Sequence, residues 1–267
     1  MRSSVADYQV IRALPASAAG EARYLCQAPD RLEQDAPIMI TELAVDAAGW
    51  RDLAGKLSRL AGVRSPYLLT LLEVGPDLDP EGAGVYLASE SAPGGNVAVP
   101  TTPLDLTDRV RAVAQAARGA HALHEAGIAH GAIDARSILL TERGAVLAPP
   151  VLGGPGGVIA LMHDWRDVVA LDPALLRGES PSRASDIWAL AATLHGVVSS
   201  RPLYADIDSD PGVTALQRIL FTRPEIDPAL PGALAETLAV SLADDPGDRV
   251  LAADELADRL AGVEVAP

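Results

Sequence analysis

Residues 130–140 of this chain have the sequence His-Gly-Ala-Ile-Asp-Ala-Arg-Ser-Ile-Leu-Leu. The segment directly upstream, residues 123–129, is Leu-His-Glu-Ala-Gly-Ile-Ala. A loop that begins at His130 therefore ends in an apolar triplet, with an alanine at position 132 and a serine at position 137. The methyl group of Ala132 can neither accept a proton nor bind a metal ion.

These segments resemble the catalytic loop of the bacterial Ser/Thr protein-kinase family, in which His-Arg-Asp is followed five residues later by Asn and an apolar triplet. In that family the Asp accepts the proton of the substrate hydroxyl and the Asn holds Mg²⁺. The resemblance places Ala132 at the base position and Ser137 at the metal-ligand position. It implies an α+β, two-lobed protein-kinase-like fold, with a small β-rich N-lobe and a larger α-helical C-lobe.

Other motifs extend the resemblance over nearly the whole chain. Residues 90–95 resemble the hinge between lobes, which places Ser89 at the position that controls access to the back of the nucleotide pocket and Glu90 in the hinge itself. The remaining matches are residues 171–174 and 185–190, similar to the end of the activation segment and the start of the central helix, and residues 244–249, similar to the turn before the last helix. The collinear set implies one domain over residues 1–267, with an N-lobe of residues 1–92 and a C-lobe of residues 93–267.

The residue patterns support this order of elements independently. Short β-type runs at residues 38–40 and 85–87 are separated by a helical stretch at residues 50–61. After residue 95 helical spacing dominates, and the apolar positions between residues 187 and 198 predict a buried central helix. Residues 252–262 predict a final amphipathic helix.

The nucleotide-binding positions of the family are changed. Residues 14–20 are Leu-Pro-Ala-Ser-Ala-Ala-Gly, so Gly20 stands for the third glycine of the phosphate loop, and Pro15 removes a backbone N–H donor. The strand lysine of the family aligns with Thr41, and its helix glutamate aligns with Lys56, the one lysine of the chain. A Thr41/Lys56 pair cannot form the ion bridge of the family.

The metal-binding positions are changed as well. The Asp of the family's Asp-Phe-Gly triplet aligns with Pro150. Mg²⁺ is a hard cation held through carboxylates and substrate phosphates, so we expect no metal site, no cofactor and no Mg-ATP binding. Residues 150–174 contain no Ser, Thr or Tyr, which excludes phosphorylation of the activation segment as a switch.

Three polar residues match positions with a structural role in the family. Asp186 resembles the central-helix Asp that accepts backbone hydrogen bonds from the catalytic loop, and His130 packs beneath that loop. Arg249 normally pairs with a Glu at the position that is Ala174 here. Because an unpaired buried guanidinium is costly, we predict that Asp172, Glu179 or water replaces that partner.

Composition limits the possible partners. The 267 residues are 49% hydrophobic, enough for a sizeable core, and carry a formal charge of −15, which argues against nucleic acid or an anionic membrane as a partner. No apolar run reaches the ~18 residues that span a bilayer, and the N-terminus lacks a signal-peptide pattern. The one cysteine, Cys26, fits a reducing compartment. We expect a cytoplasmic domain, or the cytosolic part of a longer membrane-anchored protein.

These observations predict a catalytically inactive pseudokinase, a scaffold for protein–protein interaction or an allosteric regulator in bacterial signalling. The partners that it implies are proteins, such as an active kinase or a phosphothreonine-binding domain. Candidate modification sites outside the activation segment are Thr101, Thr102, Thr107, Ser180 and Ser182.

Two alternatives remain open. One is a residual nucleotide-binding kinase or nucleotidyl transferase that uses Lys56 and Asp134 in relocated roles, although Asp134 lies two residues past the base position and is expected to be a solvated surface residue. The other is a metal-independent sensor of a small ligand in the old nucleotide cleft.

Overall fold

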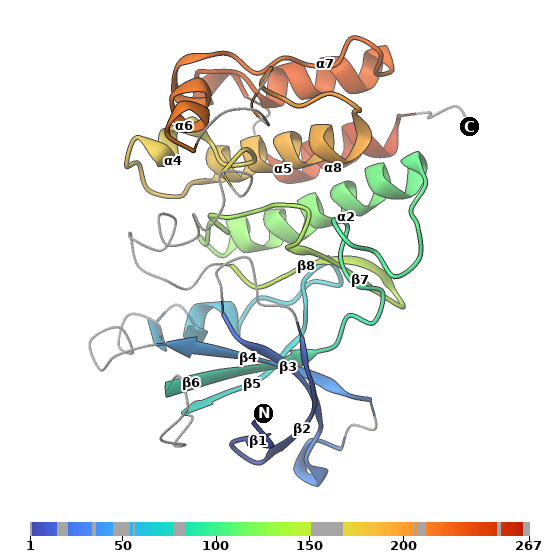
Figure 1. Ribbon diagram of the computed structural model, residues 1–267, viewed down its shortest axis with the longest axis vertical. Helices are drawn as coiled ribbons and strands as arrows, with labels where there is room; N and C mark the ends of the chain where they lie inside the picture. The colour runs from blue at the N-terminus through green and yellow to red at the C-terminus, as the bar shows by residue number, and fades with distance from the viewer. Residues whose placement is uncertain are drawn as a thin grey trace.

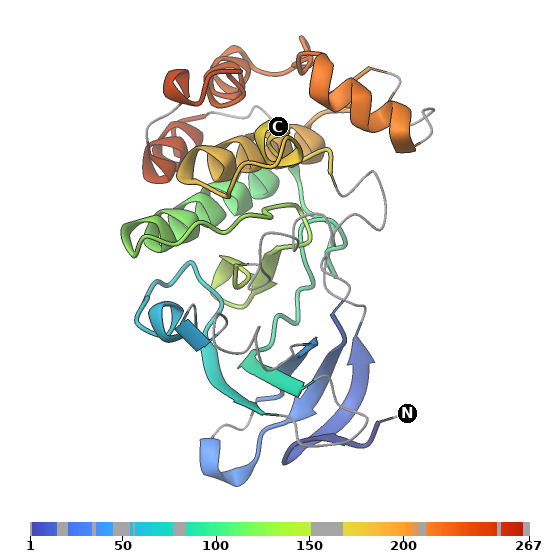
Figure 2. The same ribbon diagram turned by 90° about the vertical axis from the view of Figure 1, so that its left-hand side faces the viewer.

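A computed structural model describes residues 2–14, 21–33, 36–44, 54–55, 57–76, 84–150, 168–205, 207, 212–249 and 252–263. In the view of Figure 1 a curled β-sheet forms the lower lobe and stacked helices form the upper lobe. Figure 2, turned by 90°, shows the same division. The predicted α+β, two-lobed architecture is confirmed.

The N-lobe is one antiparallel sheet. Its strands are β1 (Ser4–Val5), β2 (Tyr8–Leu14), β3 (Arg23–Gln27), β4 (Ile38–Ala44), β5 (Leu71–Pro76) and β6 (Gly84–Glu90), and a 3-10 helix spans Asp30–Leu32. The strand order is β1-β2-β3-β4-β6-β5. Of the helix predicted over residues 50–61, residues 54–55 and 57–60 are helical, and residues 50–53 and 56 lie outside the described part.

Strand β4 separates two apolar layers because successive side chains of a strand point to opposite faces. Ile38 and Ile40 are fully buried in a cluster with Tyr8 and Tyr86. Met39, on the opposite face, belongs to a different cluster. The N-lobe therefore has a core on each side of its sheet.

The sheet curls until strands from the two ends of its order meet. The Tyr8 hydroxyl on β2 donates a hydrogen bond of 2.6 Å to Glu73 on β5, and the Tyr86 hydroxyl donates to the same carboxylate at 3.0 Å. Burial and the hydrogen bond to Glu73 raise the pKa of Tyr86 to about 12, so both hydroxyls stay protonated donors at neutral pH. Gly75 allows this closure, since a Cβ there would lie 2.6 Å from the Tyr86 hydroxyl oxygen.

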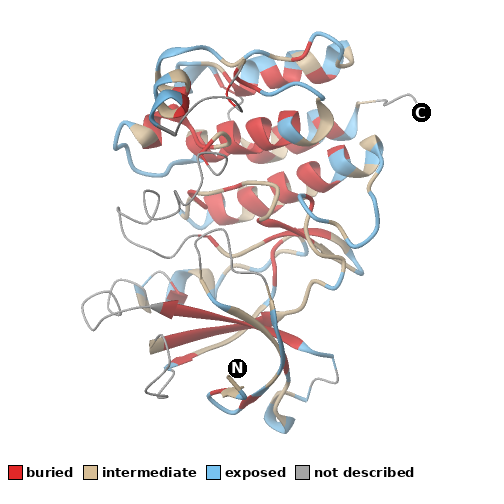
Figure 3. Cartoon of the chain, in the orientation of Figure 1, coloured by how far each residue is buried: buried red, intermediate tan, exposed pale blue. Residues whose placement is uncertain are grey.

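The C-lobe consists of helices and one two-stranded sheet. The elements are α2 (Leu106–Glu125), β7 (Ile138–Thr141), β8 (Gly144–Leu147), α4 (Pro173–Leu176), α5 (Arg183–Val198), α6 (Gly212–Phe221), α7 (Gly232–Ser241), a 3-10 helix at Pro246–Asp248 and α8 (Ala253–Ala261). Helix α5 lies at the centre and is buried along most of its length (Figure 3). The predicted central and final helices are therefore present.

Helix α5 begins at a capping box. The Ser182 side chain accepts from the Ser185 N–H at 3.1 Å, and the Ser185 hydroxyl accepts from the Ser182 N–H at 2.8 Å. This reciprocal pair satisfies two N–H groups that have no partner inside the helix. It places Asp186 in the first turn, next to the catalytic loop.

Backbone contacts join the two lobes behind the hinge. The Leu69 N–H donates to the Leu147 carbonyl at 2.9 Å, and the Leu147 N–H donates to the Tyr67 carbonyl at 2.8 Å. Helix α2 approaches the same segment through Gly119, where a Cβ would lie 2.5 Å from the Tyr67 oxygen. The strand that leads into β5 is thus held against β8 of the C-lobe.

Candidate functional site

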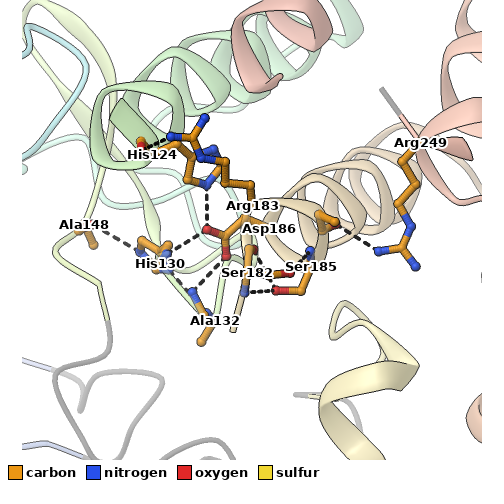
Figure 4. Close-up of polar contacts among 11 residues, drawn as sticks. His124, His130, Ala132, Ala148, Ser182, Arg183, Ser185, Asp186 and Arg249 are labelled. Atoms are coloured by element: carbon orange, nitrogen blue, oxygen red, sulfur yellow. Dashed lines mark hydrogen bonds and ion pairs between the residues drawn. The ribbon is translucent and has the colours of Figure 1, made fainter. Parts of the chain in front are cut away.

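The loop between α2 and β7 is anchored on the start of α5 by one carboxylate. Asp186, 1% exposed, accepts hydrogen bonds from the N–H groups of His130 at 2.7 Å and Gly131 at 2.8 Å. It also accepts from Nε2 of His124 on α2 at 2.8 Å (Figure 4). Asp186 therefore holds α2, the loop and α5 together from the position assigned to it by sequence.

Both ring nitrogens of His130 form hydrogen bonds, one within the loop and one to the segment after β8. The Ala132 N–H donates to Nδ1 at 3.3 Å, so Nε2 carries the proton and donates to the Ala148 carbonyl at 3.2 Å (Figure 4). Burial lowers the pKa of His130, against the attraction of Asp186. The ring is a neutral brace between the loop and the segment after β8.

The base position and its neighbour offer no free carboxylate. Ala132 presents a methyl group. The Asp134 carboxylate accepts from the N–H groups of Arg136 and Ser137, each at 2.9 Å, and from the Arg136 guanidinium at 2.7 Å. Asp134 is partly buried, with 17% of its side chain exposed. The predicted solvated surface residue is instead a loop-closing acceptor, because a carboxylate here satisfies the N–H groups of its own turn.

The two metal-ligand positions are also occupied by groups with other roles. The Ser137 hydroxyl, on a residue that is 7% exposed, donates to the Asp134 carbonyl at 2.8 Å and accepts from its N–H at 3.0 Å. Pro150 is buried directly after the segment that His130 braces. Residues 151–167, which include the glycine-rich start of the activation segment, lie outside the described residues.

On the N-lobe side of the cleft, Thr41 lies on β4, opposite Leu87 of β6, and is 9% exposed. The next residue, Glu42, forms a buried ion pair with Arg2. Gly20 and Lys56, the other two nucleotide-site positions on this lobe, lie outside the described residues.

An apolar cluster that the sequence analysis did not identify joins the lobes across the cleft. Met39 of β4, Leu139 of β7 and Val146 of β8 are 7%, 4% and 0% exposed and share one cluster with Leu69. Leu14, Ala92 and Ala148 are partly buried and pack against it. The spacing in the sequence could have predicted the place of Met39. It lies two residues before Thr41, so both side chains share the cleft-facing side of β4.

Polar contacts at the hinge lie within the N-lobe and between the lobes. The Ser89 hydroxyl donates to the Met39 carbonyl at 3.4 Å. Glu90 accepts from the Thr70 N–H at 2.8 Å and forms an ion pair with Arg143, which lies in the turn between β7 and β8. Ser89 therefore links two paired strands of the N-lobe, and Glu90 joins the lobes through Arg143.

Arg249 pairs with Asp172 in place of the glutamate of the family. Its guanidinium forms a buried ion pair with Asp172 and donates to the Ala184 carbonyl at 3.0 Å. It also lies over the Trp188 ring, 4.9 Å from the ring centre. Asp172 was one of the acceptors considered from the sequence. This arrangement ties the segment before α4 to α5 and to the turn before α8.

Comparisons with known proteins agree with this geometry. The chain is 27% identical over 193 residues to serine/threonine-protein kinase PknA of Mycobacterium tuberculosis, which covers 68% of this chain and 44% of PknA. It is 28% identical over 249 residues to serine/threonine-protein kinase PkaB of Streptomyces coelicolor, which covers 85% of this chain and 57% of PkaB. The chain thus spans about half the length of the curated relatives it matches.

Among solved structures, a mutant form of the PknI kinase domain of Mycobacterium tuberculosis matches with a TM-score of 0.71 at 20% identity, covering 98% of both chains. No family model matches the sequence. The chain has the two-lobed protein-kinase fold, and the predicted resemblance to bacterial Ser/Thr protein kinases is confirmed. In the part of the chain that the structure describes, there is no helix with the length and apolar character needed to cross a bilayer.

Proposed function

We propose that this chain is a pseudokinase, a protein-kinase-like domain that does not bind Mg-ATP or transfer phosphate and that acts as a protein-interaction scaffold or allosteric regulator in bacterial signalling. The observation that carries the proposal is the state of the catalytic loop. The frame of the loop, which is the set of hydrogen bonds from His130 and Gly131 to Asp186, is present. The base position carries a methyl group, and the neighbouring carboxylate, Asp134, is bound inside the loop.

Position 132 and Asp134 supply no free general base, which supports the proposal. A general base must come within hydrogen-bond reach of the hydroxyl that it deprotonates. Asp134 already accepts from two backbone N–H groups and from Arg136. These hydrogen bonds occupy the carboxylate oxygens that a substrate hydroxyl would have to reach. Relocating the base to Asp134 would also open the turn that shapes the loop.

The residues at the two metal-ligand positions also support the proposal. Ser137 and Pro150 stand where the family has an amide and a carboxylate ligand. The Ser137 hydroxyl is used within the loop, and proline has no side-chain oxygen. Without charged ligands, the binding of Mg²⁺ together with a triphosphate loses the attraction that compensates for dehydrating the ion.

The apolar cluster around Met39 gives the third argument. Leu139 and Val146 of the C-lobe are buried together with Met39 of the N-lobe. A flat ring that entered between the lobes at this level would have to separate these side chains and expose apolar surface, at ~25 cal/mol per Å². The cleft-facing sides of the two lobes therefore stabilise each other directly.

The test is thermal unfolding of the whole chain with ATP or ADP at millimolar concentration, with and without Mg²⁺ or Mn²⁺. A ligand at a hundred times its Kd would add ~2.7 kcal/mol of stability. We expect no nucleotide-dependent shift, and no transfer of labelled phosphate to the chain itself or to a generic substrate protein. Asp134→Asn and Lys56→Ala are the companion variants.

A metal-dependent shift that Lys56→Ala abolishes, with phosphate transfer that Asp134→Asn abolishes, would contradict the proposal and support the relocated-residue enzyme. Stabilisation by nucleotide without metal, and without transfer, would support a small-ligand sensor instead. We also propose that the partners are an active kinase or a phosphothreonine-binding domain. The same proposal places the chain in the cytoplasm, as a free domain or as part of a membrane-anchored protein.

A further inference from the structure

Helix α6 exposes two large apolar side chains on the C-lobe. Val213 and Phe221 are 71% and 83% exposed, and Phe221 is the one phenylalanine of the chain. Together with exposed Gln217 they are spaced at i, i+4 and i+8, so they lie along one side of the helix. The opposite side buries Ala215 and Ile219.

A groove of about 360 Å³ lies at the C-terminal end of this helix. Residues of α4 and α6 line it, and these two helices contact each other and lie side by side in Figure 1. Its lining includes Phe221, Arg177, Arg223 and, on its floor, Trp188. The volume falls within the range of ligand-binding pockets, about 300–1,000 Å³.

The floor of the groove is built before any partner arrives. The Arg249 guanidinium is held by Asp172 and lies over the Trp188 ring. The indole Nε1 of Trp188 is buried and has no hydrogen-bond partner among the described residues. A rigid floor reduces the entropy lost when a partner is ordered against it.

Three arginines and two aspartates line the groove, so its lining is net positive in a chain that carries a charge of −15. Residues 212–223 include two arginines and no acidic residue. Arg177, at the end of α4, is exposed and has no ion-pair partner within the described ranges. Arg223 pairs with Asp244 at 3.0 Å, but their side chains are 87% and 60% exposed. Such a pair contributes little and can be exchanged for a partner's carboxylate.

We infer that the groove between α4 and α6 is a docking site for a short acidic segment of a partner protein, with an apolar side chain that packs on Phe221 and carboxylates that pair with Arg177 and Arg223. The inference rests on the proposed scaffold function and names the surface that the scaffold uses. A second copy of the chain is disfavoured as the occupant because two molecules of charge −15 repel each other. The same long-range repulsion acts against an extended anionic polymer, whereas a short peptide meets mainly the lining of the groove.

The test uses three fluorescein-labelled synthetic 12-residue peptides and the whole chain, with binding measured by fluorescence anisotropy. The probe peptide contains Asp and Glu around a central Leu-Trp pair. One control peptide replaces the acids by Lys, and the other replaces Leu-Trp by Ser-Ser. We expect the probe to bind more tightly than either control, and its affinity to fall with added salt.

Two variants assign the binding to the groove. Phe221→Ser should weaken binding roughly 10- to 100-fold, the range for losing one buried large apolar contact. Arg177→Glu should weaken it several-fold and reduce the salt dependence. The matched controls are Val99→Ser, at a residue that is 73% exposed elsewhere, and Arg111→Glu, whose side chain is 61% exposed on α2. Both controls should bind the probe as the wild type does.

The inference is overturned if the acidic, apolar peptide binds no better than the controls, or if Phe221→Ser leaves its affinity unchanged. Self-association in sedimentation that Phe221→Ser abolishes would assign the surface to a second copy and overturn it as well. The outcome is separable from the nucleotide test. If phosphate transfer is found while the probe still needs Phe221 and Arg177, the pseudokinase proposal fails and the docking site stands.

Discussion

The polar groups beneath the catalytic loop connect distant parts of the chain, whereas those of the loop's turn bond within the turn. Asp186 accepts from His130, 56 residues away, and Arg249 pairs with Asp172, 77 residues away. Asp134, in contrast, bonds to residues two and three positions further along. The first group is buried and joins separate elements, so the fold depends on it. The positions that would perform phosphoryl transfer in a kinase contribute little to this network, so they can change while the fold persists.

Asp186→Ala should have the largest effect. It removes an acceptor that serves two backbone N–H groups and His124, all buried, and breaking such a network costs about 3–5 kcal/mol. Urea unfolding followed by circular dichroism measures the loss. Asp134→Ala is the control inside the loop and should cost about 1 kcal/mol, near the value for losing a side-chain cap. Equal losses in the two variants would show that the long-range hydrogen bonds of Asp186 stabilise the fold no more than the local hydrogen bonds of Asp134.

Met39→Ala tests whether the lobes are joined by the apolar cluster in the cleft. The side chain is 7% exposed, and truncating a buried methionine costs about 2–5 kcal/mol. Ile11→Ala on β2, at a residue that is 55% exposed, should cost under about 1 kcal/mol. The same urea titration compares them. If Met39→Ala is as mild as Ile11→Ala, the cluster does not hold the lobes together.

Acidification should lower the stability of the fold through its buried histidines. Burial lowers the pKa of both His130 and His195. Below a pH of about 6.5 the unfolded chain binds protons that the folded chain excludes, so the free energy of unfolding falls as pH falls. Unfolding titrations between pH 7.5 and 5 measure the slope. His130→Gln should make the slope shallower, and an unchanged slope would show that His130 does not contribute.

Ala132→Asp should have the smallest effect on stability. The residue is only partly buried and its side chain is a methyl group, so the variant should unfold within about 1 kcal/mol of the wild type. Phosphate transfer should not appear, because Thr41, Ser137 and Pro150 are unchanged. Ala132→Asn is the uncharged control of the same shape. Transfer by the Asp variant and not by the Asn variant would show that the cleft still admits Mg-ATP.

Much of the fold and part of the site followed from local sequence. The hinge, the central helix and the resemblance to the kinase catalytic loop depend on motifs in fixed order, which survive low overall identity. Asp172 was named among the acceptors for Arg249 because a buried guanidinium requires one. The engagement of Asp134 was not foreseen, since spacing indicates which residues share a turn and does not show which N–H groups the carboxylate reaches.

By itself, the sequence determined that this chain folds like a protein kinase and that Ala132, Ser137 and Pro150 stand at the positions aligned with the base and metal ligands of the family. The reason is physical: a methyl group, a serine in place of an amide and a proline have known chemistry wherever they lie. Only the tertiary structure decided which side chains pack between the lobes and which apolar side chains lie exposed. Met39 meets Leu139 and Val146 through folding of strands about a hundred residues apart, and Phe221 is exposed because α6 packs through its other side. Such contacts depend on the packing of whole elements, which no local pattern records.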